Sequence, residues 1–161
     1  MLIDVGALKG ETGGSKAFEG VEEVKSPSEE VDIGEVRVEG VCTNTGDAIL
    51  VSGTVKAEVR LPCSRCLAPY SITLEREFVE QFVEGEEGGD DFRPFSGDSI
   101  EIHDIIEEAV LLGLPMKAVC SPDCRGLCPV CGADLNYESC DCERDDIDPR
   151  LAVLAKLKGV D

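Results

Sequence analysis

Apolar and polar residues alternate most clearly along residues 48–61. This period of two predicts a strand that buries one face and exposes the other. Residues 36–42 predict a preceding strand, joined to it through Asn44 and Gly46, which suit a turn with left-handed backbone. Residues 70–83 predict a third strand that returns antiparallel. The apolar side chains of the first run are Ile49, Val51, Val55, Ala57, Val59 and Leu61.

The spacing of the apolar residues changes after Asp98, where they recur every three or four positions. This spacing predicts an amphipathic helix that Pro115 ends, and we expect Asp98 and Glu101 to cap its N-terminus. The acidic and glycine-rich residues 84–97 predict a flexible loop before it. The apolar side chains of the helix are Ile102, Ile105, Ile106, Ala109, Val110 and Leu112.

Weaker signals lie at both ends of the chain. Residues 2–5 and 17–24 predict two more strands, and Asp148-Pro149 predicts the start of a short terminal helix. The whole pattern predicts an α+β fold, with an antiparallel meander or barrel-like sheet covered by one helix. We expect a core domain over residues 1–115 and a cysteine-rich tail over residues 116–161.

The chain of 161 residues carries 15 basic and 34 acidic residues, a formal net charge of −19. Such a surface repels polyphosphate at long range, which argues against general nucleic-acid binding. It keeps a protein soluble, and it also suits a basic partner such as a ribosomal protein. The sequence has no apolar run of membrane-spanning length and no signal-peptide pattern, so we expect a cytoplasmic protein without a membrane partner.

Nine cysteines are present, and eight of them fall into four close pairs. A tetrahedral ion such as Zn²⁺ takes four thiolates, which two such pairs supply. Gly132, which follows Cys131, lets the backbone fold around the sulfur. We therefore expect two structural zinc sites, one that folds the tail and one that anchors it to the sheet. The first comprises Cys128, Cys131, Cys140 and Cys142, and the second comprises Cys63, Cys66, Cys120 and Cys124.

The cysteine pairs also permit other chemistry. Disulfides need an oxidising compartment, which the lack of an export signal argues against. In a redox pair Arg65 would lower the pKa of a neighbouring thiolate, but such pairs begin helices, whereas strands are expected to flank Cys63 and Cys66. Four thiolates also bind rubredoxin-type iron or an iron–sulfur cluster, which spacing alone does not separate from zinc. Cys42, the ninth cysteine, fits a small apolar position in its strand.

Catalytic residues are not indicated. Sites made of four cysteines are closed, whereas a catalytic zinc keeps one position open. His103 is the single histidine, and we interpret it as a solvated surface residue at the start of the helix. Neither a Walker loop nor a glycine-rich dinucleotide motif occurs. We interpret the carboxylates of the tail as a solvated face, and they include Asp141, Glu143, Asp145 and Asp146.

Four motifs follow one another along the chain: Leu61-Pro62-Cys63-Ser64-Arg65-Cys66-Leu67, Leu114-Pro115-Met116, Cys124-Arg125-Gly126-Leu127-Cys128-Pro129-Val130-Cys131-Gly132-Ala133-Asp134-Leu135-Asn136 and Asp148-Pro149-Arg150-Leu151. Together they resemble the YceD-like family of large ribosomal RNA subunit accumulation proteins. The resemblance implies a role in the accumulation of 23S rRNA, and hence in ribosome assembly, with no established enzymatic activity. Some members of that family lack the final four-cysteine module, which implies that the tail elaborates on the shared function.

Three hypotheses follow for the function. The acidic surface could engage a basic ribosomal protein or a pre-ribosomal particle, and so protect rRNA indirectly. The chain could instead touch rRNA itself through a local basic patch near the metal sites. The third hypothesis is a thiol-redox sensor that releases zinc on oxidation. None of them needs a small-molecule substrate. The candidate basic patch comprises Arg60, Arg65, Lys117 and Arg125.

Overall fold

The structure is a computed structural model that describes residues 1–85 and 92–142. Its main feature is an open sheet of five strands in the order β2-β3-β4-β5-β6. The first four strands form an antiparallel meander, and β6 lies parallel to β5 at one edge. The predicted meander is therefore confirmed. The strands are β2 (Ser15–Glu22), β3 (Asp32–Asn44), β4 (Ile49–Pro62), β5 (Pro69–Glu84) and β6 (Arg93–Phe95).

The period of two along the chain marks the buried face of the sheet. The six apolar residues predicted on β4 are all buried, and so are Leu74, Phe78 and Phe82 on β5. The one gap in the β4 pattern is Gly53, which pairs with Gly40 of β3. A Cβ at Gly53 would lie 2.8 Å from the Phe78 ring, so the ring fills the space that a side chain would otherwise take.

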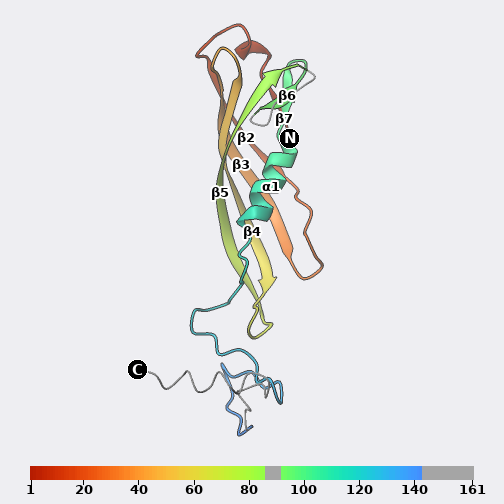
Figure 1. Ribbon diagram of the computed structural model, residues 1–161, viewed down its shortest axis with the longest axis vertical. Helices are drawn as coiled ribbons and strands as arrows, with labels where there is room; N and C mark the ends of the chain where they lie inside the picture. The colour runs from red at the N-terminus through yellow and green to blue at the C-terminus, as the bar shows by residue number, and fades with distance from the viewer. Residues whose placement is uncertain (86–91, 143–161) are drawn as a thin grey trace, which may run out of the picture.

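Helix α1 (His103–Gly113) lies along this buried face and packs on β4 and β5 (Figure 1). It buries Ile105, Ile106 and Val110 against the sheet, as its three- and four-residue spacing predicted. A short sheet of β1 (Leu2–Asp4) and β7 (Ser99–Glu101) adds Ile3 and Ile100 to the same core. A 3-10 helix, η1 (Gly6–Leu8), follows β1.

The predicted N-terminal cap of the helix is wrong. The two proposed capping residues lie before the helix, at Asp98 and in strand β7, and α1 begins at His103 without a side-chain cap. The carbonyl oxygen of Asp98 instead accepts a hydrogen bond of 2.8 Å from the backbone N–H of Val5. Ile100 and Ile102 are both fully buried, so their two-residue spacing belongs to a strand that runs directly into the helix.

The loop predicted for residues 84–97 is wrong in part. Glu84 ends β5, and Arg93–Phe95 forms β6, which pairs with β5 and buries the Phe95 side chain. Arg93 also forms ion pairs with Glu80 (3.2 Å) and Glu108 (3.1 Å). Residues 86–91 lie outside the described part of the chain.

The two N-terminal strands are confirmed as β1 and β2, although β2 begins two residues earlier than predicted and ends at Glu22. The predicted terminal helix lies outside the described residues, and the division into two domains stays a prediction. In the part of the chain that the structure describes, no helix is long and apolar enough to cross a membrane.

Candidate metal centres

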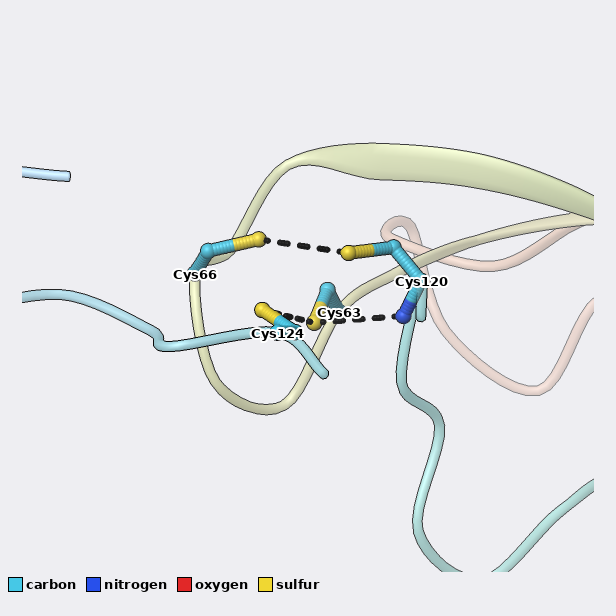
Figure 2. Close-up of side chains that lie close together, drawn as sticks. All are labelled: Cys63, Cys66, Cys120 and Cys124. Carbon is cyan, nitrogen blue, oxygen red and sulfur yellow. Dashed lines mark hydrogen bonds between the residues drawn. The ribbon is translucent and has the colours of Figure 1, made fainter. Parts of the chain in front are cut away.

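Four thiols meet just beyond the end of the β4–β5 hairpin, and we call them the anchor group. Cys63 and Cys66 come from the turn between β4 and β5, and Cys120 and Cys124 come from the segment after α1 (Figure 2). All four sulfur atoms lie within 4.8 Å of one another. The Sγ atoms of Cys63 and Cys124 are 3.8 Å apart, and those of Cys66 and Cys120 are 3.7 Å apart.

These distances fit one tetrahedral metal ion. Four sulfurs at 2.3 Å from a common centre lie about 3.8 Å from one another, which is the spacing seen. A disulfide needs about 2.05 Å, and all nine cysteines are free. An iron–sulfur cluster binds its four thiolates through separate iron atoms and needs them farther apart. The anchor group is therefore suited to a single ion, either zinc or rubredoxin-type iron.

The backbone of the β4–β5 turn directs N–H groups toward the thiol of Cys63. The N–H of Leu67 donates to the carbonyl of Cys63 at 2.9 Å, and Leu67 takes a left-handed φ of 62°, which a residue other than glycine adopts at some strain. The N–H groups of Arg65 and Cys120 each lie 3.4 Å from Cys63 Sγ. Hydrogen bonds from backbone N–H groups, first that of Cys120 and then that of Cys66, lower the pKa of Cys63 to about 6.

Apolar side chains enclose three cysteines of the anchor group, and the fourth, Cys120, is exposed. Cys63, Cys66 and Cys124 are buried among Tyr70, Val119 and Leu127. Desolvation is also the first cause that raises the pKa of Cys120, to about 12. The enclosure restricts solvent access to an ion bound by this group, as in a closed structural site.

Arg65 does not have the role that a redox pair would give it. Its guanidinium donates hydrogen bonds to the carbonyl oxygens of Pro122 (3.2 Å) and Cys124 (2.7 Å). It therefore holds the tail segment against the turn, while backbone N–H groups account for the low pKa of Cys63. Strands flank the pair on both sides, as the sequence predicted, so Cys63 lacks the helix start that activates a redox thiol.

A second set of thiols, which we call the tail group, comprises Cys128, Cys131, Cys140 and Cys142, and their sulfur atoms also lie within 4.8 Å of one another. The N–H of Gly132 donates to the carbonyl of Cys128 at 2.9 Å, with a φ of 77° at the glycine. The predicted role of Gly132 in folding this turn is thus confirmed. Backbone N–H groups of Cys131 and Val130 lower the pKa of Cys128 to about 6.

Both groups can hold a metal ion, but their surroundings differ. In the anchor group three of four cysteines are buried, whereas in the tail group Cys128 alone is buried, Cys131 is exposed and the other two are intermediate. Hydrogen bonding with the thiol of Cys131 is the first cause that raises the pKa of Cys142, to about 12. The tail group is therefore the more accessible of the two to solvent and chelators.

The structure also tests the roles predicted for Cys42, His103 and Asp141. Cys42 is fully buried, and burial raises its pKa to about 11, which confirms its small apolar role. His103 is not simply solvated, because its Nδ1 lies 2.9 Å from Glu22 Oε2, and Glu22 also pairs with the amino group of Met1. Asp141 is exposed as expected. The other three acidic residues named in the tail, Glu143, Asp145 and Asp146, lie outside the described residues.

Asn136, the last residue of the third family motif, had no role predicted from the sequence. The structure places its side-chain amide beside the anchor group, with Nδ2 3.5 Å from Cys124 Sγ. Its position shortly after the Cys128–Cys131 turn was the available signal.

Comparison with known proteins identifies the family of the chain. The family model described as large ribosomal RNA subunit accumulation protein YceD matches residues 51–158, a range that includes all eight paired cysteines. The chain belongs to the YceD family. No solved structure was found to match it.

Curated relatives of this YceD-family chain come from bacteria and plants. The uncharacterized protein Rv2926c of Mycobacterium tuberculosis is 34% identical over 131 residues, which cover 78% of this chain and 61% of that protein. The uncharacterized protein YlbN of Bacillus subtilis is 33% identical over 130 residues, covering 78% and 75%. The large ribosomal RNA subunit accumulation protein YCED homolog 1, chloroplastic, of Arabidopsis thaliana is 27% identical over 140 residues, covering 67% and 44%. The chain thus spans less than two thirds of the length of the mycobacterial and plant relatives.

Proposed function

We propose that this YceD-family chain is a non-enzymatic factor that supports accumulation of 23S rRNA and assembly of the large ribosomal subunit. The observation that carries the proposal is the family match over residues 51–158, which spans β5, α1 and both cysteine groups. The Arabidopsis relative is named for accumulation of the same class of RNA. The chain would act in the cytoplasm on a pre-ribosomal particle, through contact with a basic ribosomal protein.

Zinc at both cysteine groups is part of the proposal. Four thiolates close the coordination shell and leave no position for substrate or water, so the ions would supply folding energy and no catalysis. An ion at the anchor group would tie the segment after α1 to the end of the β4–β5 hairpin, as their arrangement in Figure 2 suggests. The hydrogen bonds of Arg65 to that segment support the same role.

The sheet face opposite α1 is the candidate surface for a basic partner. It has a hollow of about 810 Å³ whose lining includes Glu19, Glu39 and Glu77, with exposed Val41 and Val79 beside them. Glu19 and Glu39 are directly opposed on β2 and β3, where like charges repel, and Lys56 Nζ, 3.9 Å from Glu39 Oε1, offsets only part of this charge. A lysine or arginine of the partner would relieve this repulsion, while an apolar side chain could cover the two valines.

The alternative of direct rRNA contact has less support. Arg65 of the candidate patch is engaged with backbone carbonyls of the tail. Arg60, Lys117 and Arg125 are exposed, but each is a single charge on a chain whose net charge is −19. Titration of the purified chain with a 23S rRNA fragment at low salt tests direct contact. Phosphate contacts would give binding that falls steeply as salt is added.

The proposal is tested in cells that lack the native gene and express variants of this chain. Glu19→Gln, Glu39→Gln and Glu77→Gln together remove the carboxylates of the hollow, and we expect the ratio of large- to small-subunit rRNA to fall toward that of the deletion strain. A matched control removes three other exposed charges with Glu29→Gln, Glu30→Gln and Glu35→Gln. Equal ratios in the two triple variants would reject this surface, and an unchanged ratio on deletion of the gene would reject the function.

A further inference from the structure

Three residues alone, Arg125 to Leu127, separate the anchor group from the tail group, and they contact the segments of both. The N–H of Leu127 donates to the carbonyl of Arg65 in the β4–β5 turn at 3.1 Å. The carbonyl of Gly126 accepts a hydrogen bond of 2.9 Å from the N–H of Leu135, which lies in the loop of the tail group. Gly126 has a φ of 75°, and a Cβ there would lie 2.9 Å from the Arg65 oxygen. The loop of the tail group is therefore held close to the anchor group.

The side chain of Asn136 links the loop of the tail group to the anchor group. Its Oδ1 accepts a hydrogen bond of 2.8 Å from the backbone N–H of Arg125. Because a backbone N–H can only donate, this contact fixes which end of the amide is oxygen and which is nitrogen. The Nδ2 group then faces Cys124 Sγ at 3.5 Å, and Asp134 Oδ1 accepts from the same Nδ2 at 2.7 Å.

Cys124 Sγ therefore faces a donor, Nδ2 of Asn136, that belongs to neither of the two segments carrying the anchor cysteines. Cys63 Sγ accepts hydrogen bonds from the N–H of Arg65, in the same turn, and from the N–H of Cys120, in the segment that faces the turn. Asn136, in contrast, lies between Cys131 and Cys140 of the tail group. Donors to a ligating atom set its charge and orientation, and losing one lowers metal affinity by roughly 10- to 100-fold.

The loop that carries Asn136 has backbone hydrogen bonds, such as that from Leu135 to Gly126, but it has no apolar core. From residue 128 to residue 142, Cys128 is the one buried residue. The large apolar side chains of Val130 and Tyr137 are 63% and 88% exposed. A loop without an apolar core takes its folded structure from ion binding, so loss of the tail ion would also release Asn136 from Cys124.

We propose that Asn136 couples the two cysteine groups, so that metal bound by the tail group raises the metal affinity of the anchor group through the Asn136–Cys124 hydrogen bond. Asn136 is a positioning residue in this scheme and does not ligate the ion. The expected coupling is about 10- to 100-fold in affinity, and linkage requires the anchor ion to raise the affinity of the tail group by the same factor. This inference concerns metal binding alone and goes beyond the proposed function.

The test uses the full purified chain with Co²⁺ as the probe, because tetrahedral cobalt thiolate sites absorb visible light. Competition with a chelator gives the two dissociation constants. Asn136→Asp keeps the oxygen that accepts from Arg125 but loses the donor to Cys124, and we expect two ions with the anchor dissociation constant raised 10- to 100-fold. Tyr137→Ala alters the neighbouring exposed residue and should change neither constant.

A double-variant comparison separates coupling from local damage. Cys131→Ser disables the tail group, and we expect it alone to weaken the anchor group as much as Asn136→Ala does. Adding Asn136→Ala to Cys131→Ser should change the anchor constant less than about threefold. Circular dichroism of the strands confirms that each variant keeps the sheet. The proposal is overturned if Asn136→Asp leaves the anchor constant unchanged, if the two losses multiply, or if the unaltered chain binds fewer than two ions.

Discussion

Metal binding to the two cysteine groups should release protons in a number set by the thiols that are already ionised. An ordinary thiol has a pKa of about 8.5, so four ordinary thiols release close to four protons for each ion bound at pH 7. Backbone N–H groups lower the pKa of Cys63 and that of Cys128 to about 6. Each of these two is about nine-tenths ionised at pH 7, so each group should release about three protons.

We therefore predict about six protons per chain at pH 7, rising to about eight at pH 5, where Cys63 and Cys128 are protonated before metal arrives. The direction follows from the lowered pKa, because such a thiol holds its proton only below about pH 6. The same count sets the pH dependence of affinity, and each group should lose about a thousandfold for one pH unit below pH 7.

Calorimetric titration of Zn²⁺ into the metal-free chain, in buffers that differ in ionisation enthalpy, measures this number directly. Cys131→Ser is the control, since disabling the tail group should halve the count at both pH values. Release of eight protons per chain at both pH 7 and pH 5 would refute the reasoning, because Cys63 and Cys128 would then have the pKa of an ordinary thiol.

Three further predictions concern stability and thiol reactivity. Ile106→Ala should lower the free energy of unfolding by about 2–5 kcal/mol, because Ile106 is fully buried, whereas Leu112→Ala on the same helix, 75% exposed, should change it by less than about 0.5 kcal/mol in urea denaturation. Alkylation of the metal-free native chain should modify the exposed Cys131 and spare Cys42, which is fully buried in the sheet, and mass spectrometry should find Cys42 modified only after unfolding. The amino group of Met1, followed by His103, lowers the pKa of Glu22, so Glu22→Gln should lower the free energy of unfolding by about 1 kcal/mol at pH 7, with the difference vanishing as pH falls well below 4.3. An equal loss at pH 3 would show that the charge of Glu22 is not the cause.

The strands β3, β4 and β5 and helix α1 were predictable because each is long enough to repeat its pattern several times. Strand β4, fourteen residues from Ile49 to Pro62, shows period two along its length, and burial of one face of the meander follows from it. The short strands were not predictable in the same way. β6 and β7 have three residues each, too few for a period; β6 forms because it pairs with the end of β5, and β7 forms because it pairs with β1 at the start of the chain.

The close pairs of cysteines in the sequence, together with the expected strands and helix, predicted the two groups of four thiols that the structure brings together. Short Cys-x-x-Cys turns bring two sulfurs together by local backbone geometry, so sequence neighbours sufficed for half of each group. Tertiary structure decided what surrounds them: the apolar enclosure of the anchor group, the hydrogen bonds of Arg65 to the tail, and the bridge from Asn136 to Cys124. These contacts join residues that are separated in the chain, and no local pattern specifies them, because they depend on how β4, β5 and the tail meet in space.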